Sequence, residues 1–246
     1  MKTLLKIDHV SLTFPMVEKK ILENISYDIA EGDFVIVLGG NGSGKSSLLK
    51  LIDKRYKTTH GAIYYRGVEI NKMAVQTYYQ SVKTLTQSTV ESLFPSLTVM
   101  ENYKLFVAAN NKKPDLIFKN NRELADFLAQ FNAQLATKLD QQVIFLSGGE
   151  KQALVLALTM MNPPDLLLLD EHTSALDPKS ADNIIQLTGE LVKKHRITCL
   201  LATHDLQLAA TFGDRLLALK DGKVYRTLEK PQKSSLTSQD LRSLCY

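Results

Sequence analysis

The sequence predicts an α/β fold built on a mainly parallel core sheet, and three observations indicate it. Short apolar runs alternate with segments of helical periodicity, which is typical of α/β proteins. Residues 34–38 are apolar, rich in β-branched side chains and followed directly by two glycines, as expected for a central strand. From about residue 98 to 160 helical spacing dominates, which predicts a mostly helical insertion between sheet strands.

The individual elements follow from local patterns along the chain. Residues 4–14 alternate apolar and charged side chains and predict a first strand, and residues 21–29 predict a second. The central strand leads into a helix at 46–53, where leucine and isoleucine recur at helical spacing. The later elements are expected in this order: strands at 61–70 and 82–85, helices of the insertion, strand 166–169, helix 179–194, strand 197–202, a short helix, and strands near 215–219 and 223–227.

Composition narrows the class of protein. The 246 residues suffice for a large α/β domain, and 44% hydrophobic with 23% charged residues is ordinary for a soluble globular chain. Cys199 and Cys245 lie far apart, which argues against a disulfide framework and fits a reducing compartment. The net charge of +4 is spread along the chain, so a solvated surface is favoured over a nucleic-acid site. Because no apolar run approaches ~20 residues and Asp8 interrupts the N-terminal stretch, a membrane role would require another chain.

A glycine-rich motif lies between the central strand and the next helix. It matches G-x-x-x-x-G-K-[ST], in which glycines let backbone N–H groups turn toward phosphate oxygens at a helix start. Lys45 would reach the β- and γ-phosphates, and the Ser46 hydroxyl would ligate Mg²⁺. A glycine turn with an incidental lysine is disfavoured by this context. The candidate nucleotide-binding residues are Gly39, Gly40, Asn41, Gly42, Ser43, Gly44, Lys45, Ser46 and Ser47.

Two acids, Asp170 and Glu171, end the apolar strand at 166–169. Ligands of open α/β sheets bind beyond the carboxyl ends of strands. Asp170 would therefore hold Mg²⁺, and Glu171 would orient or deprotonate the attacking water. Two acids in this place are often only the polar cap of a turn, but the preceding phosphate loop favours the catalytic interpretation and a P-loop NTPase.

A third motif, Leu-Ser-Gly-Gly-Glu-Lys-Gln at residues 146–152, resembles the signature sequence of ABC ATPases. Ser147 and Glu150 also have capping-box spacing, and a capped glycine-rich helix start is itself an anion site. The resemblance covers essentially the whole chain. It implies a P-loop NTPase of ABC type: one ATP-binding domain over residues 1–246, with an N-terminal antiparallel β region and, at about 88–160, an inserted helical subdomain that carries the signature.

The resemblance assigns further roles by position. Phe14 corresponds to the aromatic that stacks on adenine, and Gln87 to the glutamine that senses Mg²⁺ and water. Asp177 lies in the loop that crosses the dimer interface, and His204 corresponds to the switch histidine at the γ-phosphate. The candidate catalytic residues are therefore Glu171 and His204, and the candidate metal ligands are Ser46, Gln87 and Asp170.

The family works as a head-to-tail dimer in which each ATP lies between the phosphate loop of one chain and the signature of the other. The resemblance thus implies that Ser147 and the Gly149 N–H bind the γ-phosphate held by the second chain, and that the signature residues Ser147, Gly148, Gly149 and Glu150 are nucleotide-binding. Because Glu171 and His204 are both present, it favours a homodimer or an equally competent partner. It also implies a transmembrane permease subunit, a substrate-binding protein for import, a peripheral location on the inner face of the cell membrane and no nucleic acid. Leu93, Phe94 and Leu97 are either an apolar contact for the permease or core of the insertion.

The residue after the catalytic glutamate indicates a branch of the family. Most ABC ATPases have proline after the catalytic glutamate, and His172 stands there in this chain. The sequence around His172 is similar to that of ATPases of amino-acid-type importers, including tryptophan or tyrosine uptake systems. His172 itself either contacts the machinery that couples the ATPase to its substrate or has no special role. The alternative is a soluble, non-transporter ABC ATPase such as an iron–sulfur assembly factor. A DNA-repair ATPase is disfavoured because the roughly 100 residues between phosphate loop and signature hold no sustained heptads.

Overall fold

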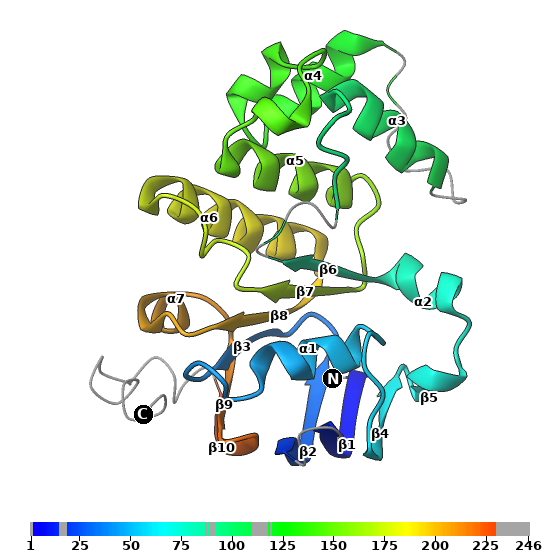
Figure 1. Ribbon diagram of the computed structural model, residues 1–246, viewed down its shortest axis with the longest axis vertical. Coiled ribbons are helices and arrows are strands. Elements are labelled where there is room, and N and C mark those ends of the chain that lie inside the picture. Colours follow the sequence, from blue (N-terminus) through cyan, green and yellow to red (C-terminus); the bar gives the residue numbers. More distant parts are fainter. Residues whose placement is uncertain are drawn as a thin grey trace. The chain divides into compact units, whose positions relative to one another are not determined.

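The computed structural model describes residues 2–14, 19–86, 88, 92–109, 118 and 120–229 (Figure 1). The chain divides into two compact units. The first unit comprises residues 1–84, 165–170 and 192–246, and the second comprises 85–164 and 171–191. Within the described residues, no helix combines the length and the apolar character needed to cross a membrane. The assignment of residues 1–246 to one ATP-binding domain with an insertion at about 88–160 stays a prediction.

An antiparallel sheet in the first unit contains β1 (Thr3–Phe14), β2 (Lys19–Ala30), β4 (His60–Tyr65) and β5 (Val68–Glu69), in the order β2-β1-β4-β5. Period-two alternation explains β1, because Leu5 and Ile7 are buried while Lys6 between them is exposed. The register between β1 and β2 shifts from Ile7 to Val10, where His9 has φ 50°. The predicted N-terminal antiparallel region is therefore present.

The core sheet has six strands, and its order places the phosphate loop at its centre. Its strands are β3 (Phe34–Leu38), β6 (Val82–Thr86), β7 (Leu166–Asp170), β8 (Thr198–Thr203), β9 (Arg215–Lys220) and β10 (Lys223–Leu228), in the order β10-β9-β3-β8-β7-β6. The strand β3 pairs in parallel with both β8 and β9, and β7 pairs in parallel with β8. The residues of β3 and β8 are all buried, as expected for central strands covered on both faces.

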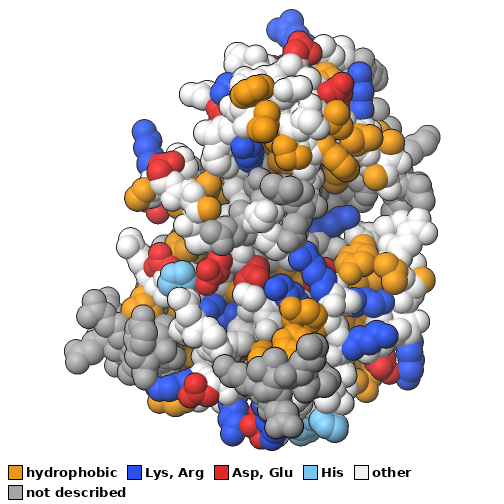
Figure 2. All heavy atoms as spheres, in the orientation of Figure 1, with side chains coloured by type: hydrophobic (Ala, Val, Ile, Leu, Met, Phe, Trp, Pro, Cys, Tyr) orange, Lys and Arg blue, Asp and Glu red, His pale blue; other side chains and the backbone are white. Residues whose placement is uncertain are grey.

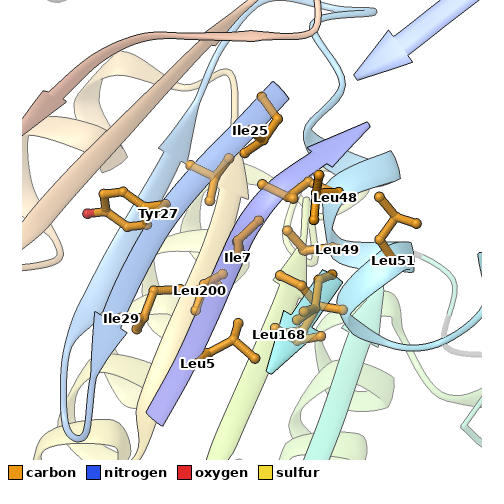
Figure 3. Close-up of a cluster of buried hydrophobic side chains, with 14 of the residues drawn as sticks. Leu5, Ile7, Ile25, Tyr27, Ile29, Leu48, Leu49, Leu51, Leu168 and Leu200 are labelled. Atoms are coloured by element: carbon orange, nitrogen blue, oxygen red, sulfur yellow. The ribbon is translucent and has the colours of Figure 1, made fainter. Parts of the chain in front are cut away.

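Leucines of α1 (Lys45–Ile52) join the two sheets of the first unit. Leu48 and Leu49 are buried in one cluster with Ile7 of β1, Leu168 of β7 and Leu200 of β8 (Figure 3). Truncating one such leucine costs about 2–5 kcal/mol of folding free energy. The helix that begins directly after the phosphate loop is therefore anchored in the core. The other helical turns of this unit are η1 (Ile70–Lys72), α2 (Val75–Ser81) and α7 (Leu206–Thr211).

The second unit is mostly helical. Its helices are α3 (Val99–Ala109), α4 (Asn121–Ala129), α5 (Gly148–Met160) and the larger part of α6 (Pro178–His195), with 3₁₀ turns η3 (Ala133–Thr137) and η4 (Val143–Phe145). Local capping starts α4, because the Asn120 side chain accepts a hydrogen bond from Glu123 N at 3.0 Å. A buried amide ties down the segment before α3: Asn102 Nδ2 donates to Phe94 O at 3.1 Å and to Thr98 O at 2.9 Å.

Candidate functional site

The phosphate loop has the backbone geometry that its glycines predict. Gly42 and Gly44 have φ of 78° and 104°, in the left-handed region that favours glycine. A Cβ on Gly44 would lie 2.6 Å from Leu22 Cδ2, and one on Gly39 would lie 2.4 Å from Leu219 O. At Gly39 and Gly44 the backbone of the loop therefore lies too close to neighbouring atoms for any residue with a Cβ.

Two polar side chains of the loop are buried. Lys45 is 5% exposed, and its Nζ donates to Gly39 O at 2.8 Å and to Gly40 O at 3.0 Å. Ser43 Oγ is buried without a hydrogen-bond partner in the described structure. An unsatisfied buried hydroxyl costs about 1–3 kcal/mol, and a ligand that brings oxygen acceptors to the loop would remove that cost. The arrangement fits a bound phosphate chain.

The candidate metal ligands of the first unit lie in contact. Ser46 Oγ, on α1, donates to Asp170 Oδ1, at the end of β7, at 2.8 Å, although 124 positions separate the two residues. Hydroxyl and carboxylate oxygens are the hard ligands that Mg²⁺ prefers, and one or two carboxylates with phosphate oxygens suffice to bind it. The residues present thus fit Mg²⁺. Gln87, the third candidate ligand, lies outside the described residues.

The strand order brings several candidate residues to one edge of the core sheet. The phosphate loop follows β3, Asp170 ends β7, and His204 follows β8, which lies between those two strands. Because the three strands are parallel, these residues share the carboxyl edge. His204 is exposed and precedes a capped helix start, where Asp205 Oδ1 accepts from Gln207 N at 2.7 Å. This edge is the candidate nucleotide site of the first unit.

Glu171 follows β7 directly and is the first residue of the second unit after that strand. Its backbone has a positive φ. Its φ is 47°, in the left-handed region, and its carbonyl oxygen accepts from Ser174 N at 3.0 Å and from Ser174 Oγ at 2.8 Å. The next side chain, His172, is 2% exposed, and neither ring nitrogen has a hydrogen-bond partner in the described structure. Burial lowers the pKa of His172 to about 4, so the imidazole is neutral at physiological pH.

The signature residues form a capped helix start in the second unit. Ser147 Oγ accepts from Glu150 N at 3.3 Å, and Glu150 Oε2 accepts from Ser147 N at 2.9 Å. Lys138 Nζ donates to the second carboxylate oxygen of Glu150 at 2.6 Å. Burial raises the pKa of Glu150, but the hydrogen bonds from Lys138 and from the Ser147 backbone outweigh it and hold that pKa below its usual range. Glu150 is thus an ionised capping residue.

The two glycines of the signature pack closely within the second unit. A Cβ on Gly149 would lie 3.1 Å from Ser180 Oγ, and one on Gly148 would lie 3.0 Å from Leu176 Cδ2. Asp177 caps the following helix, because its Oδ1 accepts from Ser180 N at 3.1 Å, and the hydrogen bonds from Ser180 lower the pKa of Asp177. Gly148 is nevertheless exposed at the N-terminus of α5, where a helix presents backbone N–H groups of a kind that bind anions.

Phe14 ends β1 and contacts a second aromatic ring. The rings of Phe14 and Tyr56 meet edge to face, with centroids 5.3 Å apart and planes at 88°. Lys50 Nζ lies 5.6 Å from the centroid of the Tyr56 ring. Phe14 therefore packs against Tyr56 within the first unit.

Comparison with known proteins decides the family. The family described as ABC transporter matches residues 22–174, more than half of the chain. This chain belongs to the ABC transporter family. It is 37% identical to a tyrosine transport ATP-binding protein of Clostridioides difficile, over 97% of both chains. It is 29% identical to methionine import ATP-binding protein MetN 3 of Oceanobacillus iheyensis, over 98% of this chain and 72% of that protein.

Solved structures of ABC cassettes have the same fold. The dimeric structure of the ATP-binding cassette MJ0796 bound to ADP and phosphate is 30% identical, with a TM-score of 0.74 over 92% of this chain and 99% of that chain. CbiO1 of Clostridium perfringens, part of the transporter complex cbiONQ, is 27% identical, with a TM-score of 0.78 over 94% of this chain and 90% of that chain. The predicted ABC-type fold is confirmed.

This ABC protein is an ATP-binding and ATP-hydrolysing subunit of a transporter, as the resemblance implied. Nothing in the comparisons favours a soluble assembly factor. Two contacts of candidate site residues escaped prediction: the ion pair of Lys138 with Glu150, and the ring contact of Tyr56 with Phe14. Nothing in the sequence points to Lys138 as the partner of Glu150. For Tyr56, its position as an aromatic residue shortly after α1 is a weak signal.

Proposed function

We propose that this ABC ATPase hydrolyses ATP with Mg²⁺ at the carboxyl edge of its core sheet and thereby powers import of tyrosine or a closely related amino acid. The contact of Ser46 with Asp170 beside the buried Lys45 carries the nucleotide part of the proposal. The 37% identity to a tyrosine transport ATP-binding protein over nearly the whole chain supports the substrate class.

In this proposal the first unit binds the nucleotide. The loop residues 39–47 and Lys45 bind the phosphates, and the ring of Phe14 stacks on the adenine. Ser46, Gln87 and Asp170 would hold Mg²⁺, which neutralises charge on the β- and γ-phosphates. The support is local: the left-handed glycines, the unsatisfied Ser43 hydroxyl and the adjacent hydroxyl and carboxylate.

Glu171 and His204 are the proposed catalytic residues. The carboxylate of Glu171 accepts a proton from the attacking water as its oxygen bonds to the γ-phosphorus, and the bond from that phosphorus to the β-phosphate oxygen breaks. The exposed ring of His204 contacts the γ-phosphate from the end of β8. His204 follows β8, which pairs with β3 before the phosphate loop, and Glu171 follows β7, which pairs with β8.

The signature is proposed to act on the ATP of a second copy of this chain. Ser147, Gly148, Gly149 and the capped start of α5 would bind its γ-phosphate, with Glu150 fixing their backbone through its capping hydrogen bonds. Asp177 would lie at the dimer interface. A chain with one phosphate loop and one signature needs two copies for two such sites, and the dimeric MJ0796 cassette supports that arrangement.

The second unit offers an apolar surface for a permease. Phe94, Ile144 and Phe145 are 58%, 55% and 69% exposed, and Ile144 N donates to Pro95 O at 2.8 Å, so the two segments adjoin. Leu93 is buried and therefore belongs to the core of the unit. Figure 2 shows hydrophobic side chains exposed among polar ones where Figure 1 draws α3 and α4. We assign this surface to a transmembrane permease at the inner face of the cell membrane, served by a substrate-binding protein.

Uptake of labelled tyrosine into vesicles that contain the chain with its co-purified permease tests the proposed function. We expect ATP-driven tyrosine uptake, stimulated by a substrate-binding protein and lost on removal of Mg²⁺. Uptake of methionine but not tyrosine would contradict the substrate assignment. For the surface, Phe94→Ser should prevent co-purification of the permease, whereas Val75→Ser, at a 59% exposed site of the first unit, should not. Equal recovery of the permease by both variants would remove Phe94 from the interface.

A further inference from the structure

Two adjacent residues after β7 are held in unfavourable states. Glu171 has a φ of 47°, which a side chain with a Cβ rarely adopts. His172 is 2% exposed, and both of its ring nitrogens lack a hydrogen-bond partner in the described structure. Backbone strain and unsatisfied buried polar atoms both gather at active sites and switch regions.

Packing alone does not account for an imidazole at this position. An aliphatic side chain of similar volume would fill the same space without burying two polar nitrogens that have lost their hydrogen bonds to water. Replacing an unsatisfied buried polar group by an apolar one of the same shape is neutral or stabilising. The nitrogens of His172 therefore lower the stability of the conformation described here, and a conformation that gives one of them a hydrogen bond would recover part of that cost.

The segment that holds both residues is bounded by fixed elements. It begins where the buried strand β7 ends at Asp170, and it ends at Asp177, which caps α6. Between them Ser174 N donates to Glu171 O at 3.0 Å, and Leu176 N donates to Thr173 O at 3.1 Å, each over three positions of the chain. Both hydrogen bonds lie inside the segment, so neither of them ties it to β7 or to α6.

We propose that residues 171–177 form a two-state segment and that His172 is a positioning residue for Glu171. In the state that binds ATP, a ring nitrogen of His172 gains a hydrogen bond and Glu171 leaves the left-handed region, which aims its carboxylate at the attacking water. ATP favours this state because only there does the Glu171 carboxylate hold the attacking water beside the γ-phosphate, and a ligand shifts an equilibrium by the contacts it gains in one state alone. The inference rests on the catalytic role proposed for Glu171.

The proposal is tested in the full chain with two variants of His172, to leucine and to glutamine, and with Thr188→Val as a buried control. We expect His172→Leu to raise the melting temperature without nucleotide by roughly 2–4 °C, because it removes two unsatisfied nitrogens. It should lower kcat for ATP hydrolysis by about tenfold, or about 1.4 kcal/mol, with KM unchanged. His172→Gln keeps polar atoms and should recover most of the rate. Thr188→Val removes a buried hydroxyl that donates to Ile184 O at 2.7 Å, so it should lower the melting temperature and leave kcat unchanged.

Amide hydrogen exchange of residues 171–174, which exclude the proposed interface residue Asp177, gives a second measurement. Adding Mg²⁺ and ATPγS should change exchange in the wild-type chain and leave it unchanged in His172→Leu. A lower melting temperature for His172→Leu, or its failure to fold, would contradict the cost assigned to the buried nitrogens and would overturn the proposal. A wild-type kcat for that variant would overturn it as well. Failure of the proposed function is distinct, since Glu171→Gln would then hydrolyse ATP at the wild-type rate.

Discussion

Replacing Gly44 by alanine tests whether the shape of the phosphate loop depends on the absence of one Cβ. Gly44 has φ 104°, and the added Cβ would lie 2.6 Å from Leu22 Cδ2 and 3.1 Å from Ile21 O. The backbone conformation alone costs an alanine about 1–2 kcal/mol. Crowding of the well-packed Leu22 adds about 1–3 kcal/mol. We therefore expect a total loss of about 2–5 kcal/mol of unfolding free energy.

Gly67 provides the matched control. Its φ is 81°, but a Cβ there meets no atom within 4 Å, so Gly67→Ala should carry only the backbone cost. Urea unfolding of the two variants gives the crowding contribution as their difference. ATP titration should show a raised dissociation constant for Gly44→Ala, because relief of the contact with Leu22 displaces backbone N–H groups that bind phosphate, with a tenfold rise for each loss of about 1.4 kcal/mol of binding free energy. The dissociation constant should be unchanged for Gly67→Ala. Equal losses of stability, or equal ATP affinities, would refute the role given to Gly44.

Four further variants test the roles of Glu171, Asp170 and Glu150. Glu171→Gln should bind ATP as the wild type does and hydrolyse it about 10²–10⁴-fold more slowly; a wild-type rate in a turnover assay would exclude Glu171 as the base. Asp170→Asn should raise the Mg²⁺ concentration for half-maximal hydrolysis about tenfold or more, while ATP binding in EDTA stays the same; an unchanged Mg²⁺ titration would remove Asp170 from the metal site. Lys138→Met should cost about 1–3 kcal/mol of unfolding free energy, because it leaves the Glu150 carboxylate buried without its cation. Since the pKa of Glu150 is lower in the folded chain than in the unfolded one, its stabilisation is complete above the ordinary glutamate pKa of 4.5 and is lost as the pH falls through the lowered value. Glu150→Gln should therefore flatten the acid limb of the stability curve, and an unchanged acid limb would refute the ion pair.

Local patterns in the sequence predicted the parts of the site that depend on backbone chemistry. The phosphate loop could be identified because its glycines are needed for left-handed φ and close approach, and both are observed at Gly44. The Ser147 and Glu150 spacing predicted a capping box, and both hydrogen bonds of that box are present. Asp170 could be assigned to a strand end because the strand before it is continuously apolar.

Features that depend on tertiary contacts could not be predicted. The helix α2 went unpredicted because distant groups hold it: Tyr78 is fully buried, its hydroxyl donates to Ile52 O at 2.6 Å, and the Tyr79 hydroxyl donates to Asp53 O at 2.6 Å. The same is true of the burial of His172, which lies in a segment with the polar composition of an exposed turn. Its position beside Glu171 was visible in the sequence, whereas its unsatisfied nitrogens required the fold.

Mixing two inactive variants tests the central claim, that each ATP is hydrolysed between the phosphate loop of one chain and the signature of another. Ser147→Arg chains and Lys45→Ala chains should each lack hydrolysis as homodimers. After mixing and proven exchange of subunits, half of the chains are in heterodimers at random pairing, each with one intact composite site. The account predicts that ATP hydrolysis returns in proportion to the heterodimer. Heterodimers that form and remain as inactive as the parent variants would contradict it.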